Sequence, residues 1–336
     1  MNPSTVRQAE KSPVQGTVIE AIPPEANWNE APSLIEGATQ LELTAEDCHL
    51  DYWFSAAVRG TLQGTINGHS PQARIPAYMN EPGPLRDAIM NEFAFRSIAE
   101  EKATRAISYI VANSPDADNM EFFGTQLIDE ARHSRVFRGH LLELGVLENE
   151  LFDTIQRISG KDSDNILVPL EDFALPMLRD QRDFIAGVVI LTIIVEGVLA
   201  PSAELSHRKW RLLDPAAAEI ERGANIDEIR HLTVGGSVVR KYLLDHPQER
   251  ERVLDIVMQG RELWTQLPTI DVIMKRELYF QEGLAQQADV VGDYEIWEGK
   301  RLIDTTPEER LGAAHSWSME MQNSRLLYMG LGEAIL

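Results

Sequence analysis

A six-residue motif that occurs twice constrains the fold of this chain more than any other feature. Ile128-Asp-Glu-Ala-Arg-His133 returns ninety-eight residues later as Ile226-Asp-Glu-Ile-Arg-His231, so both copies contain Glu-x-x-His. Side chains three residues apart lie on the same face of a helix, so each copy would point one carboxylate and one imidazole into the same space. Two such helices, with one inward glutamate from each of two others, form a dinuclear metal site inside a four-helix bundle.

Apolar periodicity and the positions of proline predict the four long helices that such a site needs. The first is expected over about 85–112 and the second over about 119–144. The third, the most apolar, is expected over about 170–200 with a kink at Pro176. The fourth begins at an Asp-Pro pair and covers about 215–246. Both motif copies are in phase with the apolar stripe of their helices, which places Glu130, His133, Glu228 and His231 on the inward faces.

Shorter elements are expected around these four helices. The polar, proline-containing residues 1–40 are typical of a flexible or wrapping arm, and residues 41–336 of a single all-α domain with its core bundle at about 85–245. The other predictions are a helix from Thr44 through Val58, a short helix over 147–158 followed by a polar loop over 160–165, two helices after Pro247, a short strand within 293–302, and a last helix at the capping box that begins at Thr306.

Two lone glutamates complete the predicted ligand set. Glu196 is the one charged residue in the apolar run 185–200, where an ionised carboxylate costs several kcal/mol unless it is paired or binds a metal. In the first long helix, Glu100 shares a face with apolar residues, whereas Glu101 lies on the polar side and is the second choice. Glu100 precedes Glu130 by thirty residues and Glu196 precedes Glu228 by thirty-two, as two antiparallel helix pairs would require.

The composition of this ligand set predicts the metal. The set carries four negative charges on its carboxylates, which neutralise two divalent ions. Oxygen ligands with one imidazole per metal favour iron or manganese over zinc or copper. Iron is the better fit because it also supplies redox chemistry. Asp129 and Asp227 could accept the outer N–H of the ligand histidines, and Arg132 and Arg230 could pair with these aspartates.

Composition limits the partners and the compartment. A net charge of −22 argues against a nucleic acid partner, because the phosphate backbone would repel this surface. Cys48 is the only cysteine, which excludes a disulfide framework and fits the cytoplasm. The first residues contain no apolar segment of the kind found in signal peptides, so none is expected. The apolar run 185–200 is shorter than the roughly twenty residues of a membrane span and is read as a buried core helix.

The doubled Asp-Glu-x-Arg-His, with a glutamate about thirty residues before each copy, resembles the ferritin-like di-iron oxygenases and oxidases. That superfamily includes the soluble methane monooxygenase hydroxylase, acyl-carrier-protein desaturases, ribonucleotide reductase radical subunits and arylamine N-oxygenases. The resemblance covers about residues 85–245. It implies a ferritin-like four-helix bundle with additional helices, two iron ions, O2 as co-substrate, and an external electron donor or reductase as partner.

Residues 129–137 look most similar to the valanimycin-type azoxy-pathway proteins and their cyanobacterial halogenase relatives. This resemblance implies natural product biosynthesis in which a nitrogen centre of a small hydrazine, hydroxylamine or amine is oxidised, by N-oxygenation or azoxy formation. A C–H hydroxylase, desaturase or halogenase acting on an acyl or alkyl substrate is the alternative. Ala224 stands where the arylamine N-oxygenases carry an extra histidine ligand, so this chain departs from that branch.

Two other classes fit the sequence less well. An iron-storage or structural metal protein would use a similar ligand set, but storage ferritins are about half this length and build shells. A ribonucleotide reductase radical subunit needs a tyrosine beside the metals, and Tyr109 falls on the polar side of its helix. Catalytic residues beyond the metal ligands, the substrate itself, and the choice between a monomer and a homodimer stay open.

Overall fold

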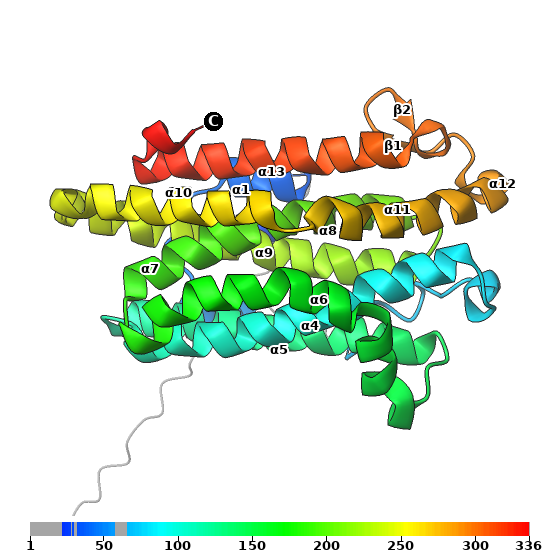
Figure 1. The fold of residues 1–336 in the computed structure, drawn as a ribbon, viewed down its shortest axis with the longest axis horizontal. Coiled ribbons are helices and arrows are strands. Elements are labelled where there is room, and N and C mark those ends of the chain that lie inside the picture. The colour runs from blue at the N-terminus through cyan, green and yellow to red at the C-terminus, as the bar shows by residue number, and fades with distance from the viewer. Residues whose placement is uncertain (1–21, 28, 30–31, 58–65, 336) are drawn as a thin grey trace, which may run out of the picture.

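The computed structural model describes residues 22–27, 29, 32–57 and 66–335, and these residues are almost entirely helical (Figure 1). The all-α prediction is therefore confirmed. The described strands are β1 (Glu295–Trp297) and β2 (Lys300–Arg301), which pair antiparallel in a small hairpin at one end of the molecule. This hairpin lies inside the stretch 293–302 that was expected to hold a strand.

Four long helical segments form the centre of the molecule. They are α4 (Pro84–Asn113), α5 (Ala117–Glu143), the continuous run α7 (Phe184–Val189), η6 (Ile190–Glu196) and α8 (Gly197–Trp210), and finally α9 (Pro215–Asp245). Short connections join α4 to α5 and α8 to α9, so the helices of each pair run antiparallel. Because α5 packs on α9, and α7 packs on both α4 and α9, the four segments surround a common interior.

Further helices cover this centre. Helices α6 and α11 pack on α4, α13 packs on α8 and α9, and α10 packs on η6 and α7. The bounds of these outer and connecting elements are η1 Pro24–Ala26, α1 Leu34–Gln40, α2 Leu50–Tyr52, η2 Trp53–Ala57, η3 Ala77–Asn80, η4 Glu148–Glu150, α6 Leu151–Leu175, η5 Pro176–Asp180, η7 Pro247–Glu249, α10 Arg250–Gln266, α11 Thr269–Gln286, α12 Ala288–Val291, η8 Leu302–Asp304, α13 Pro307–Met329 and η9 Gly332–Ala334.

Helix ends follow the local sequence signals. Asp116 and Asp214 cap α5 and α9 by accepting hydrogen bonds from the backbone N–H groups of Asn119 and Ala217. Thr306 and Glu309 form the expected capping box at the start of α13. The predictions for α4, α5 and α9 agree with the structure to within two residues at each end.

Three predicted elements are wrong. The polar stretch 160–165 is no loop, because α6 continues through it and buries Ser159 and Ser163; the Ser159 hydroxyl donates to the carbonyl of Asn91 in α4 at 3.1 Å. The helix expected over 170–200 is interrupted, since α6 ends at Leu175 and Arg182 adopts a φ of 57° before α7 begins. The helix expected from Thr44 begins only at Leu50, and Val58 lies outside the described residues.

The predicted arm over residues 1–40 is described in part. In the described part, Glu25 is fully buried and α1 packs against α8, α9 and α13. This part of the arm is therefore wrapped onto the helices and contributes Leu34 and Ala38 to the buried core.

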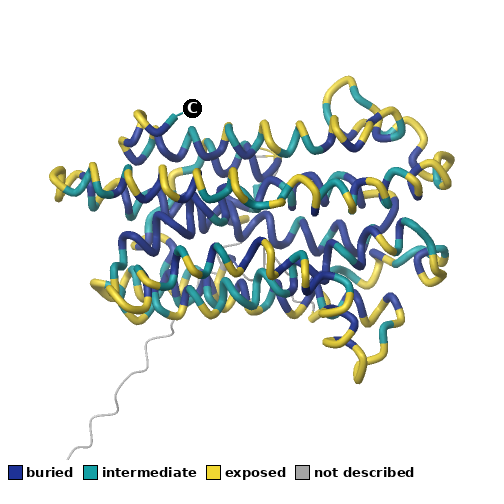
Figure 2. Tube along the Cα trace, in the orientation of Figure 1, coloured by how far each residue is buried: buried dark blue, intermediate teal, exposed yellow. Residues whose placement is uncertain are grey.

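Most of the apolar core lies in two large clusters separated along the long axis, and the smaller third cluster is the one to which α1 contributes. One cluster contains the C-terminal half of α4 and the N-terminal half of α5, for example Ile107 and Phe123, together with α7 and η6. The other contains the opposite halves, for example Phe93 and Phe137, together with α8 and the start of α9. The middle of each long helix, including the dark buried stretch of α9 in Figure 2, therefore lies between two apolar regions.

The run from Phe184 to Trp210 is long and apolar enough to cross a membrane by length and composition. In the folded chain, 78% of its most apolar window is buried inside the protein. This burial matches the core helix that was expected over 185–200.

Helix α9 approaches η6 very closely at Gly235. A Cβ atom added there would lie 2.1 Å from the hydroxyl oxygen of Thr192, so only glycine permits this distance. Gly235 lies one turn after His231, and Thr192 lies one turn before Glu196. The contact therefore sets how closely two predicted ligands meet.

We expect Gly235→Ala to lower the free energy of unfolding by about 1–3 kcal/mol through overpacking against Thr192. Gly139→Ala in α5 is the matched control, because a Cβ there meets nothing within 4 Å. The control should be neutral or stabilising by up to about 1 kcal/mol, from its better helix propensity. Urea unfolding of both variants measures the difference, and equal stability would contradict the close-approach explanation.

Candidate metal centre

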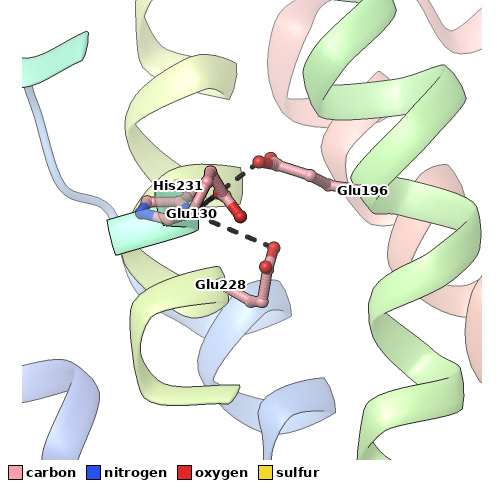
Figure 3. Close-up of side chains that lie close together, drawn as sticks. All are labelled: Glu130, Glu196, Glu228 and His231. Carbon is pink, nitrogen blue, oxygen red and sulfur yellow. Dashed lines mark ion pairs between the residues drawn. The ribbon is translucent and has the colours of Figure 1, made fainter. Parts of the chain in front are cut away.

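The structure brings the six predicted ligand residues to one level in the middle of the four long segments. Two groups of ligand-type atoms lie close enough to hold a metal ion: Glu130, Glu196, Glu228 and His231 in one, and Glu100, Glu130 and His133 in the other. Glu130 belongs to both. Figure 3 shows the first group, with Glu196 reaching from its helix toward Glu228 and His231 on α9.

Each oxygen of Glu130 faces a different histidine. Its Oε1 lies 3.2 Å from Nδ1 of His231, and its Oε2 lies 3.4 Å from Nδ1 of His133. The Nδ1 of His231 also lies 3.7 Å from Glu196 and 4.0 Å from Glu228, and that of His133 lies 3.9 Å from Glu100. A carboxylate placed between two imidazoles in this way could bridge two cations.

A change in helix type positions Glu196. The chain winds as a π-helix through η6, and the N–H of Gly197 donates to the carbonyl of Thr192, five residues earlier. Such π-helical turns are frequent at functional sites. Glu196 then accepts a hydrogen bond of 2.6 Å from the side-chain amide of Gln126, which lies one turn before Glu130 on α5.

The choice between the glutamates of α4 follows the predicted helix phase. Glu100 is largely buried and faces His133, whereas the side chain of Glu101 is 46% exposed and pairs with Arg105 at 2.8 Å. Glu92 is buried but lies elsewhere, where it pairs with Arg96 and Lys209. The structure therefore brings Glu100, and neither Glu101 nor Glu92, to the candidate centre.

Each histidine is oriented by an aspartate from the other motif copy. Nε2 of His133 lies 3.1 Å from Asp227, and Nε2 of His231 lies 3.4 Å from Asp129. Because a carboxylate can only accept, each Nε2 carries the proton and donates it. Both Nδ1 atoms then face the glutamates, and these are the atoms that would bind a metal through their lone pairs once deprotonated.

Two arginines tie these aspartates together. Arg230 donates to Asp129 at 2.6 Å and to Asp227 at 2.8 Å, and Arg132 pairs with Asp227 and lies 3.6 Å from Asp129. Arg230 and both aspartates are almost completely buried. The four residues that the sequence suggested as outer partners are thus joined in one network behind the histidines.

The donor set fits a pair of divalent cations. Several buried atoms that face the interior have no hydrogen-bond partner: Glu130 Oε1, Glu196 Oε2, Glu228 Oε2, His133 Nδ1 and His231 Nδ1. An unsatisfied buried polar atom costs about 1–3 kcal/mol, so five at one place are unusual. All five are ligand atoms, and a bound cation would satisfy them.

The pKa values of the glutamates also reflect excess negative charge. Burial, reinforced by the charge of Glu130, raises the pKa of Glu100 well above its ordinary value and that of Glu228 to about 7. Burial and the charge of Glu228 raise the pKa of Glu196 in the same direction. Burial opposes ionisation of Glu130 too, but the neighbouring Glu100 carboxyl and the two histidines hold its pKa well below the usual range. Cations bound here would displace protons from the cluster.

Sequence reasoning missed four residues that complete the surroundings. Gln126 is fully in phase with Glu130 and could have been found from the helical period. Glu25, Tyr52 and Trp53 carried no signal, because they come from the short helices η1, α2 and η2, whose packing no periodicity reveals. Trp53 donates to Asp129 at 2.9 Å, while Glu25 accepts from Arg230 at 3.1 Å and from the Tyr52 hydroxyl at 2.6 Å.

A scan against protein-family models and a search of curated proteins found no match to this chain. The chemistry of the site is therefore the main guide to its function.

We expect Glu130→Ala and Glu228→Ala to lose most of the metal when the protein is loaded with Mn²⁺ and desalted. The loss should be larger for Glu130→Ala, because Glu130 belongs to both ligand groups. Elemental analysis measures the metal, and far-UV circular dichroism should show a helical content close to wild type. Glu101→Ala, an exposed neighbour on α4, is the control and should keep wild-type occupancy. Full occupancy in either ligand variant would refute the site.

Proposed function

We propose that this protein is a non-haem di-iron enzyme, an O2-dependent oxygenase or oxidase built on a ferritin-like four-helix bundle. The observation that carries the proposal is the position of Glu130, buried between two imidazoles and shared by two groups of potential ligands. Such paired Glu-x-x-His helices, with one glutamate from each of two other helices, are the pattern of the di-iron carboxylate proteins.

The ligand set supports iron over zinc or copper. Glu100, Glu130 and His133 would hold one ion, and Glu130, Glu196, Glu228 and His231 the other, so oxygen ligands dominate at both positions. Manganese shares this preference, but iron also supports the chemistry proposed. When bound, the two irons would supply the reduction of O2 and the oxidation of the substrate.

The protein's own residues would prepare this chemistry. Asp129 and Asp227 hold the histidine tautomers, and Gln126 holds Glu196, so the ligands are oriented before metal binds. The apolar clusters on either side of the centre, which include the fully buried Ile193 and Phe137, exclude bulk water from it. A dry and rigid site favours selective oxidation over side reactions.

The proposed substrate is a small metabolite with a nitrogen centre, such as a hydrazine, hydroxylamine or amine, within natural product biosynthesis. The support is the resemblance of residues 129–137 to azoxy-pathway proteins. Ala224, buried on α9 one turn before Glu228, brings no ligand atom, which leaves a coordination position open for O2 or substrate. We further propose a cytoplasmic enzyme that receives electrons from an external donor or reductase and binds neither nucleic acid nor membrane.

Turnover experiments test the reaction. We expect the chain loaded with Fe²⁺ to hold about two irons and, with a reductant, to consume O2 faster when a hydroxylamine or hydrazine is present. Mass spectrometry should then detect the N-oxidised product. If only acyl or alkyl substrates are converted, the nitrogen assignment fails and a C–H hydroxylase, desaturase or halogenase takes its place.

The two lone glutamates provide a separate test of the same activity. Glu100→Ala and Glu196→Ala should abolish O2-dependent turnover, because each removes the single ligand that its helix contributes to one of the two ligand groups. Glu101→Ala should retain most of it, since this side chain points to solvent. A sensitive Glu101 together with a tolerant Glu100 would contradict the ligand assignment on α4.

A further inference from the structure

We infer that Glu25, from the N-terminal segment, is a positioning residue that sets the metal affinity of the centre through Arg230. The inference rests on the proposed di-iron centre. Glu25 stands 205 residues from Arg230 in the chain, yet its Oε1 accepts a hydrogen bond of 3.1 Å from that guanidinium. Both side chains are at most 1% exposed, so this pair is shielded from solvent and from salt.

Arg230 is shared by three carboxylates. It contacts Glu25, Asp129 and Asp227, and each aspartate accepts the outer proton of one ligand histidine. The layer behind the histidines therefore contains three carboxylates and the two guanidiniums of Arg132 and Arg230. The third carboxylate, Glu25, gives this layer one net negative charge.

This charge acts on the ligands in a definite direction. If Glu25 were neutral, the two aspartates alone would balance the positive charge of Arg230. The guanidinium would then attract the electrons of the aspartate oxygens more strongly. The aspartates would then accept less strongly from the histidines, which become weaker bases and weaker ligands. A less negative layer also favours the reduced, less positive metal centre, so its reduction potential should rise.

A second residue besides Arg230 holds the Glu25 side chain in place. The hydroxyl of Tyr52 donates to Oε2 of Glu25 at 2.6 Å, so both carboxylate oxygens are bonded. Tyr52 belongs to α2, and the next residue, Trp53, donates to Asp129. The η1 segment and the adjoining α2 and η2 segment, which lie outside the four long helices, thus both contact the layer behind the histidines.

The test is the Fe²⁺ affinity of Glu25→Gln, measured anaerobically by competition with a chelator. The variant keeps the size of the side chain and an oxygen for Tyr52 but removes the charge. We expect about a tenfold loss of affinity, the lower end of the 10–100-fold seen for outer-layer partners, because Glu25 acts through Arg230. The reduction potential should move to more positive values, and Tyr52→Phe should show a smaller loss.

Glu204→Gln is the matched control. Glu204 is also a buried carboxylate that holds the N-terminal region, since it accepts from the N–H of Leu34 at 3.2 Å. Its contacts among the described residues are with Leu34, Arg208 and Asn225, and they include neither aspartate of the outer layer. This variant should lower the unfolding temperature while keeping wild-type Fe²⁺ affinity and potential.

Two results would overturn the inference. Unchanged affinity and potential in Glu25→Gln, with only a lower unfolding temperature, would make Glu25 a structural residue. An equal loss of affinity in Glu204→Gln would assign the effect to general loosening of the N-terminal region. A wild-type chain that takes up no iron would instead refute the proposed di-iron centre, so the two failures are distinguishable.

Discussion

Four carboxylates gathered around two histidines in the middle of the long helices are the constraint on which the rest of this structure depends. Removing ionised groups from water costs several kcal/mol each, and their mutual repulsion adds to that cost in a medium of low dielectric constant. Among the described residues, the basic groups within ion-pair distance of Glu100, Glu130, Glu196 and Glu228 are the two imidazoles of His133 and His231. The surrounding helices must therefore supply enough apolar burial to hold together a centre that opposes folding.

The arrangement of the two apolar clusters meets this requirement. Because α4 and α5 run antiparallel, as do α8 and α9, the middle of each helix lies at the same level and both ends are free for apolar packing. The spacings of thirty and thirty-two residues between lone glutamate and motif express this geometry in the sequence. Helices α5 and α9 also contact each other, and there Asp129 supports His231 while Asp227 supports His133, so each motif copy orients the other.

Those parts of the site that repeat with a helical period could be predicted from the sequence. Glu130, His133, Glu228 and His231 follow from their spacing, and Glu100 follows from its phase relative to apolar neighbours. The outer residues Glu25, Tyr52 and Trp53 could not be predicted, because they reach the centre through tertiary contacts of the short helices η1, α2 and η2, which are too brief to show a helical period. The same limit applies to α6, where buried serines on the packing face of a helix have the composition of a loop. It also applies to the π-helix η6 that ends at Glu196, because a change from i→i−4 to i→i−5 hydrogen bonds leaves no trace in composition.

A second buried charged cluster differs from the candidate centre in its charge balance. Glu92, Glu221 and Glu277 are as buried as the candidate ligands, but each lies within ion-pair distance of Arg96, Lys209 or Arg310. The charges of Lys209 and Arg96 overcome the effect of burial and hold the pKa of Glu92 down, at about 2, whereas burial still raises the pKa of Glu221 to about 7. At the candidate centre no lysine or arginine among the described residues enters the carboxylate cluster, since Arg132 and Arg230 stand behind the histidines. The four central glutamates, which in the described part of the chain lack the guanidinium and ammonium partners of that second cluster, therefore belong to the groups that could hold a different cation, a metal ion.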